Sequence, residues 1–129
     1  MSIKISSRKA KGRKLQQWVC KQISEAIRIP YTPGNDNSLI QSRPMGQKST
    51  DVVLRGQAQD LFPFSVECKS TEKINLYTDI SQAMMNVKGE SDWLLIHKRN
   101  GSSPIAILDA KAFFNIIEDI IDLKNTTNE

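Results

Sequence analysis

Residues 62–69 (FPFSVECK) constrain the fold most, because apolar and polar side chains alternate along them as in a half-buried β-strand. Successive side chains of a strand point to opposite faces. The expected buried face consists of Phe64, Val66 and Cys68. The opposite face carries Glu67 and Lys69, so a carboxylate and an amine lie one strand repeat apart. We therefore expect the chemistry of the chain on this polar face.

The size and composition of the chain indicate a single domain. Its 129 residues allow one modest core, and we expect flexible ends at residues 1–8 and 125–129. No apolar run approaches the ~20 residues of a membrane span, and no signal-peptide pattern opens the chain, so we expect a cytoplasmic protein without a membrane partner. Cys20 and Cys68 form neither a disulfide framework nor a zinc cluster, and we expect buried free thiols.

Hydrophobic periodicity predicts an α/β protein. The expected helices cover residues 13–27 and 77–88, followed by a last helix capped by Asp109. The expected strands are residues 39–42, 52–55, 62–69, 93–98 and 105–108. A strand–helix–strand crossover in the middle implies a central mixed β-sheet with helices packed on its faces.

Basic residues are concentrated at the N-terminus. The net charge is +4, and no acidic residue precedes Glu25. Such asymmetry is typical of a helix or arm that meets a polyanion, and nucleic acid is the expected one. A solvated charged face is the structural alternative.

Asp51 precedes the 52–55 strand, and it lies beside Glu67 if the 52–55 and 62–69 strands pair as a hairpin. Two carboxylates a few ångströms apart raise each other's pKa unless a cation sits between them. Magnesium takes oxygen ligands and is held by one or two carboxylates, so Asp51, Glu67 and the backbone carbonyl of Cys68 form a candidate site. Lys69 would lie over an attacking water or a phosphate oxygen. The alternative is a turn aspartate next to an ordinary exposed strand face.

These residues carry a resemblance to a known family. Asp51 followed by Glu67-Cys68-Lys69 resembles the PD-(D/E)xK nuclease motif, although Thr50 stands where the usual proline would be. With Lys11-Gly12-Arg13 before the first helix, the chain is similar to archaeal-type Holliday-junction resolvases and related phage-encoded endonucleases. The resemblance implies a restriction-endonuclease-like fold, Mg²⁺ that Mn²⁺ can replace, no nucleotide cofactor, and a homodimer that cuts branched DNA.

The resemblance also assigns two amides to the site. Gln16 stands where resolvases carry a glutamate in the first helix, and Gln82 lies in the helix that follows the lysine strand. An amide can orient a water but adds no negative charge, so one magnesium ion is expected instead of two.

We therefore predict a structure-selective, Mg²⁺-dependent DNA endonuclease in which Asp51, Glu67 and Lys69 act with Gln16 and Gln82. The alternatives are a nuclease of this fold acting on linear or nicked DNA, a non-catalytic DNA-binding module, and a plain interaction domain. The last helix and the 93–108 hairpin are candidates for the dimer contact. The expected DNA-binding residues are Arg8, Lys9, Lys11, Arg13, Lys14, Arg43 and Lys48.

Overall fold

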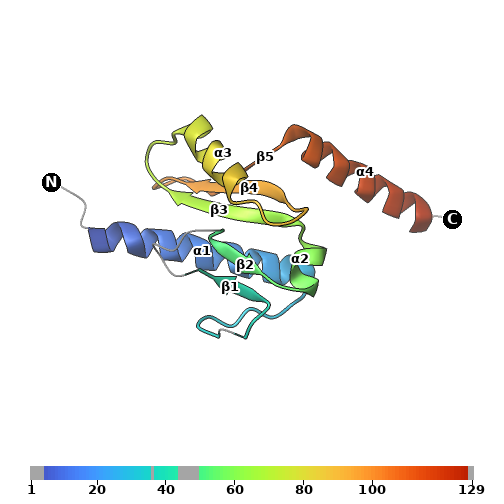
Figure 1. Cartoon of the computed structure of the whole chain (residues 1–129), viewed down its shortest axis with the longest axis horizontal. Coiled ribbons are helices and arrows are strands. Elements are labelled where there is room, and N and C mark those ends of the chain that lie inside the picture. The colour runs from blue at the N-terminus through green and yellow to red at the C-terminus, as the bar shows by residue number, and fades with distance from the viewer. Residues whose placement is uncertain (1–4, 36, 44–49, 128–129) are drawn as a thin grey trace.

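A long N-terminal helix packs against two small β-sheets (Figure 1). The computed structural model describes residues 5–35, 37–43 and 50–127. The helices are α1 (Ile5–Ile27), α2 (Gln57–Leu61), α3 (Leu76–Met85) and α4 (Ala110–Thr127). The strands are β1 (Ile40–Ser42), β2 (Val52–Leu54), β3 (Phe64–Ser70), β4 (Asp92–Lys98) and β5 (Ile105–Leu108). The predicted α/β class is confirmed.

Helix α1 begins at Ile5, earlier than the start near Arg13 that the sequence predicts. Gly12 lies inside the helix and does not open it. A glycine there costs about 1 kcal/mol relative to alanine, and the Lys, Arg and Ala residues around it are good helix formers that offset this cost. The buried face of α1 consists of Leu15, Gln16, Val19, Cys20 and Ile23. The spacing of Trp18 from Leu15 predicts that it lies on this apolar face, but it lies at the edge of the face and is 43% exposed.

Strands β3, β4 and β5 form a mixed sheet. β3 pairs in parallel with β4, with Glu67 opposite Leu95, and β4 pairs antiparallel with β5. α3 makes the crossover between the parallel strands (Figure 1). On β3 the apolar side chains meet α1 in the core, as the alternation of residues 62–69 predicts.

Strands β1 and β2 form a separate antiparallel pair, with Ser42 opposite Val52. The hairpin between β2 and β3 that the sequence suggested is therefore wrong, because β1 occupies one edge of β2 and α2 intervenes before β3. One backbone hydrogen bond still joins the two sheets: the N–H of Asp51 donates to the carbonyl of Val66 at 3.0 Å. This contact brings the start of β2 beside the middle of β3.

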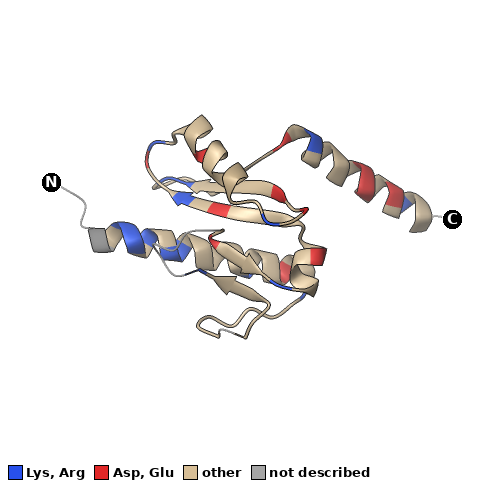
Figure 2. Ribbon diagram, viewed as in Figure 1, with Lys and Arg blue, Asp and Glu red and all other residues tan. Residues whose placement is uncertain are grey.

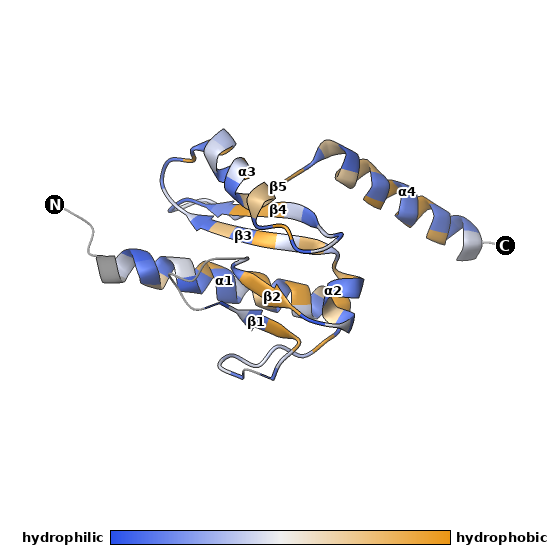
Figure 3. Cartoon of the chain, in the orientation of Figure 1, coloured by the Kyte–Doolittle hydropathy of each residue, from blue (hydrophilic) through white to orange (hydrophobic). Residues whose placement is uncertain are grey.

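Helices α3 and α4 leave apolar side chains in contact with solvent. Met84 and Met85 are 56% and 85% exposed on α3. On α4 the cap is confirmed, since Asp109 accepts a hydrogen bond from the N–H of Ala112 at 3.1 Å. Helix α4 extends beyond the sheet, and hydrophobic residues recur along its length (Figure 3). Within the described ranges, no helix is both long and apolar enough to cross a membrane.

Candidate metal centre

Asp51 and Glu67 meet at the boundary between the two sheets. Asp51 directly precedes β2, and Glu67 occupies the middle of β3. The Oδ2 atom of Asp51 accepts a hydrogen bond from the backbone N–H of Cys68 at 2.7 Å, and the Asp51 and Glu67 carboxyls share a further hydrogen bond. The predicted pair of carboxylates is therefore brought together, although by a different strand pairing from the one expected.

Burial makes it unfavourable for both carboxyls to be ionised at once. Glu67 is 4% exposed, and desolvation together with the charge of Asp51 raises its pKa from 4.5 to about 7. Desolvation also raises the pKa of Asp51, while the Cys68 N–H and the charges of Lys69 and Arg43 act in the opposite direction. A proton or a cation is needed between two such groups. This arrangement fits a hard divalent cation with oxygen ligands.

Asn86, which the sequence did not single out, holds the Glu67 carboxylate. Its Nδ2 atom donates a hydrogen bond to Glu67 Oε1 at 2.8 Å from the C-terminal end of α3. Gln82 lies one helical turn earlier, and its side chain is exposed. The four-residue spacing from Gln82 could have indicated Asn86 in the sequence. Once Gln82 is assigned to the helix edge near the site, Asn86 lies on the same edge, one turn closer to the next strand.

The side chains of Lys69 and Cys68 lie on opposite faces of β3. Lys69 is half-buried on the same face as Glu67, and its ammonium lowers the pKa of both carboxyls. The Cys68 thiol packs against the core on the other face, and burial raises its pKa well above the usual value.

The backbone carbonyl of Cys68 is directed to the edge of β3 at which Asp51 lies. Alternate residues of a strand direct their backbone groups to the same edge. The carbonyl of Val66 accepts from the Asp51 N–H on that edge, and the N–H of Cys68 reaches Asp51 there too. The carbonyl of Cys68 is therefore available as a third oxygen ligand.

Gln16 reaches the same region from α1. Its side chain is 3% exposed, and its Oε1 atom accepts a hydrogen bond from Ser42 Oγ at 2.8 Å. Ser42 pairs with Val52, the residue after Asp51, so the hydrogen bond holds the Gln16 amide at the end of the β1–β2 pair from which Asp51 extends.

The expected DNA-binding residues occupy different positions. Arg43 is fixed beside the site, with its Nε donating to the Thr50 carbonyl at 2.7 Å and its backbone N–H donating to the Asp51 carbonyl at 2.9 Å. Lys48 lies outside the described residues. The α1 cations form a basic stretch near the N-terminal end of the helix (Figure 2). Of these, Arg8, Lys9, Arg13 and Lys14 are exposed and Lys11 is half-buried.

The ligand set is small. Among residues 5–35, 37–43 and 50–127, no group of three or more His, Cys, Asp and Glu side chains is placed to hold a metal ion. Two carboxylates and one carbonyl would supply three oxygen ligands and leave the other coordination positions of Mg²⁺ to water and substrate, which is the usual way proteins bind this ion.

No protein-family model, curated protein or solved structure matches this chain.

Proposed function

We propose that the chain is a Mg²⁺-dependent DNA endonuclease of the PD-(D/E)xK type, with Mn²⁺ able to replace Mg²⁺. The observation that carries this proposal is the meeting of Asp51 and Glu67 in a buried, hydrogen-bonded pair with Lys69 on the same strand face. The mixed sheet with α1 and α3 packed on it is compatible with a restriction-endonuclease-like arrangement.

In this mechanism Asp51 and Glu67 hold the ion, with the Cys68 carbonyl as the third protein ligand. Bound magnesium supplies positive charge for the scissile phosphate and lowers the pKa of a coordinated water. Lys69 orients the attacking water or a phosphate oxygen through its ammonium. Asn86 is a positioning residue, because it fixes one oxygen of Glu67 and leaves the carboxylate in a defined rotamer. The buried Gln16 amide supports the water network from α1.

The proposed substrate is branched DNA cut by a homodimer. The outer edge of β5 carries no strand among the described residues, and Ile105 on it is 54% exposed. The adjoining helix α4 exposes Phe114 and Leu123 at 62% and 67%. A second copy placed there would cover both surfaces and would set two candidate metal centres at a fixed distance, as paired cuts across a junction require.

A second candidate, a DNA-binding module without catalysis, is favoured by the small ligand set. Mutagenesis separates the two. Asp51→Asn and Lys69→Ala are each expected to abolish Mg²⁺-dependent cleavage and to leave DNA binding largely intact. The exposed residues Asp60 and Lys111 provide matched controls, as Asp60→Asn and Lys111→Ala.

The assay compares a four-way junction with a linear duplex of the same sequence in Mg²⁺. Preferential cutting of the junction supports the structure-selective activity, and equal cutting of both DNAs supports a nuclease of linear DNA. Cleavage that survives both site variants rejects the site. DNA binding with no cleavage by the wild-type protein supports the non-catalytic module.

A further inference from the structure

One face of α1 carries four basic residues and an exposed tryptophan. Their spacings are three, three, four and three residues, which places them on one side of a helix. The set consists of Arg8, Lys11, Lys14, Trp18 and Lys21. It extends over about 20 Å at the helical rise per residue. Leu15 and Val19, on the adjacent face, are buried.

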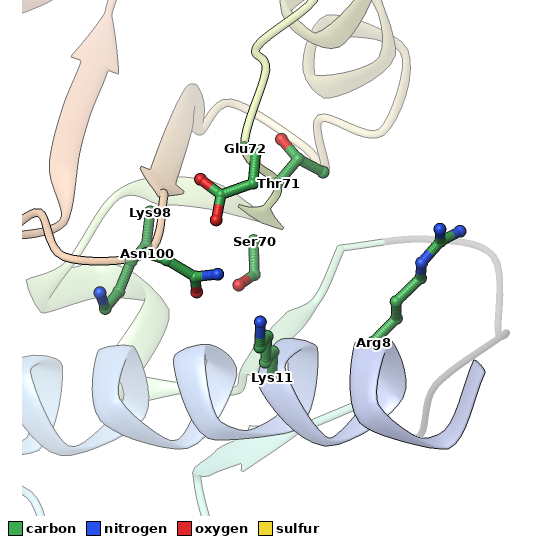
Figure 4. A pocket seen from close by; sticks show the side chains of 7 residues that line it. All are labelled: Arg8, Lys11, Ser70, Thr71, Glu72, Lys98 and Asn100. Carbon is green, nitrogen blue, oxygen red and sulfur yellow. The ribbon is translucent and has the colours of Figure 1, made fainter. Parts of the chain in front are cut away.

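A pocket of about 390 Å³ lies between the start of this face and the C-terminal ends of β3 and β4 (Figure 4). In Figure 4 the Lys11 side chain extends from α1 toward Ser70 and Asn100. Glu72 is the one carboxylate among the lining residues, and it lies at this end of the face. The two remaining cations that line the pocket are Arg8 and Lys98.

The face continues through two further pockets. A pocket of about 320 Å³ shares Lys11 and Lys98 with the first and adds Lys14 and Trp18. None of the described residues that line it is a carboxylate. A third pocket, of about 600 Å³, shares Lys14 and Trp18 with the second and adds Lys21 together with one carboxylate, Glu25. Because each pocket shares lining side chains with the next, we infer one groove along α1, whose central section is lined by three lysines and one indole.

The charge of Lys98 is held at this groove by the turn that follows β4. Its ammonium donates to the carbonyl of Ser102 at 2.8 Å and to the carbonyl of Arg99 at 3.2 Å. A cation fixed in this way loses less side-chain entropy when an anion binds than a free lysine does. It lies opposite Lys11 and Lys14, so negative groups in the groove are contacted from both walls.

Trp18 distinguishes the expected ligand from other polyanions. The indole is 43% exposed and lies one turn from Lys14 on one side and from Lys21 on the other. Grooves that bind single-stranded nucleic acid combine lysine and arginine along the backbone with aromatic rings on which bases stack. Bases in a duplex are already stacked on each other, so an aromatic side chain on the wall of a groove is useful only to an unpaired base.

We propose that this groove binds a single strand of nucleic acid, with phosphates on Lys11, Lys14 and Lys98 and an unpaired base stacked on Trp18. Ser70, at the groove wall, directly follows Lys69 of the candidate metal centre, and because successive side chains of a strand point to opposite faces, the groove and the site lie on opposite faces of the same end of β3. Binding of the strand does not depend on the proposed nuclease function; only the assignment of this strand to the substrate rests on it. The substrate class is then DNA that offers both a scissile phosphate and an unpaired strand, such as a flap or an opened branch.

The test is binding without metal, so that cleavage plays no part. Wild-type protein in EDTA is titrated into a labelled oligo-dT of about 20 nucleotides and into a blunt hairpin duplex of equal charge. We expect tighter binding of oligo-dT, with quenching of tryptophan fluorescence. Trp18→Ala is expected to weaken oligo-dT binding about tenfold, in line with the energy of one stacked base, and Trp18→Phe to retain most of the affinity but lose most of the quenching.

Two controls separate stacking from folding. Tyr77→Ala removes an aromatic side chain that is 80% exposed on α3, outside the groove, and is expected to leave binding unchanged. Lys14→Glu changes an exposed helix position, so it should fold, and is expected to weaken oligo-dT binding and to reduce its salt dependence.

Equal affinity of Trp18→Ala and wild type for oligo-dT, or preference of the wild type for the duplex, overturns the proposal. Unaltered binding by Lys14→Glu also overturns it. Oligo-dT binding with no cleavage of any DNA rejects the nuclease and keeps the groove. If the protein cleaves DNA but Trp18→Ala and Lys14→Glu leave oligo-dT binding unchanged, the groove is rejected and the nuclease is kept.

Discussion

The side chain of Asp51 accepts a hydrogen bond from the backbone N–H of Cys68 at 2.7 Å, and this contact joins the two sheets at the candidate metal centre. The carboxylate therefore has two functions in the proposal. It completes the hydrogen bonding of a strand edge, and it contributes negative charge for a cation. The hydrogen-bonding function and the charge of Asp51 can be tested separately by substitutions that keep one and remove the other.

The first prediction concerns the stability of Asp51 variants without metal. Asp51→Asn keeps an oxygen for the Cys68 N–H and removes a carboxyl whose pKa is raised by burial. At pH 8 in EDTA we expect its melting temperature to exceed that of the wild type by about 3 °C. Asp51→Ala leaves the Cys68 N–H without its acceptor and is expected to lose about 1–3 kcal/mol of unfolding free energy. Thermal and urea unfolding measure both. Equal stability of the two variants contradicts a structural role for this hydrogen bond.

The second prediction concerns Asn86. Its amide holds Glu67 Oε1, so Asn86→Ala frees the Glu67 carboxylate to rotate. Loss of a group that orients a metal ligand typically costs 10- to 100-fold in affinity, and we expect a loss of about tenfold for Mn²⁺, measured by calorimetry. Asn115→Ala, on α4, is the matched control. A larger loss with Gln82→Ala than with Asn86→Ala would show that the supporting amide is the one the sequence indicated.

The third prediction is the pH dependence of stability in EDTA. The pKa of Glu67 is 4.5 in an unfolded chain and about 7 in the fold. A group with a raised pKa contributes stability that is fully present below pH 4.5 and is lost as pH rises through about 7. The raised pKa of Asp51 acts in the same direction. The unfolding free energy is therefore expected to fall between pH 5 and pH 8.

Glu67→Gln tests the origin of this pH dependence. The variant is expected to flatten the fall in urea unfolding experiments, while Glu90→Gln, at an exposed position, is expected to leave it unchanged. Added Mg²⁺ should restore stability at pH 8 in the wild type and not in Glu67→Gln, because a ligand that binds only the folded state stabilises it. A wild-type curve without slope in this range contradicts the burial of the pair.

The fourth prediction concerns the assembly. Ile121 is 51% exposed on α4, beside other apolar side chains of this helix. Ile121→Lys is expected to convert the proposed dimer into a monomer, because it places an unpaired charge in an apolar contact. Asn115→Lys adds the same charge to the same helix and serves as the control. Light scattering after gel filtration measures the mass, and a wild-type monomer at micromolar concentration rejects this dimer.

Local patterns predicted much of the fold. The alternation in residues 62–69 correctly assigned Val66 to the core, and the apolar strands β4 and β5 were found at nearly their observed bounds. These features depend on side-chain period alone. The pairing of β2 with β1 was not predicted, because strand partners are set by the path of the chain and by which edges remain open, which no short window of sequence reports.

The candidate site was predicted only in part, because residue types and spacing can be read from the sequence but the path of the chain cannot. Asp51, Glu67 and Lys69 were recognised from their residue types and spacing, and the structure brings them together. Asn86 was missed because its place depends on where α3 ends and how the crossover returns to β4. Trp18 has the spacing of the buried residues of α1, so periodicity assigned it to the core. Its exposure depends on how α1 is rotated against the sheets, which periodicity does not report.

The position of the carboxylate pair between two sheets has a consequence for local opening of the fold. Asp51 directly precedes a strand of one sheet and Glu67 lies in a strand of the other, so the ligands separate whenever the sheets move apart, even if each sheet stays intact. Release of the ion is then limited by this sub-global opening and not by the exchange of a single side chain. The amide proton of Cys68 reports on it directly, and its hydrogen–deuterium exchange is expected to slow more on Mg²⁺ addition than exchange within β4.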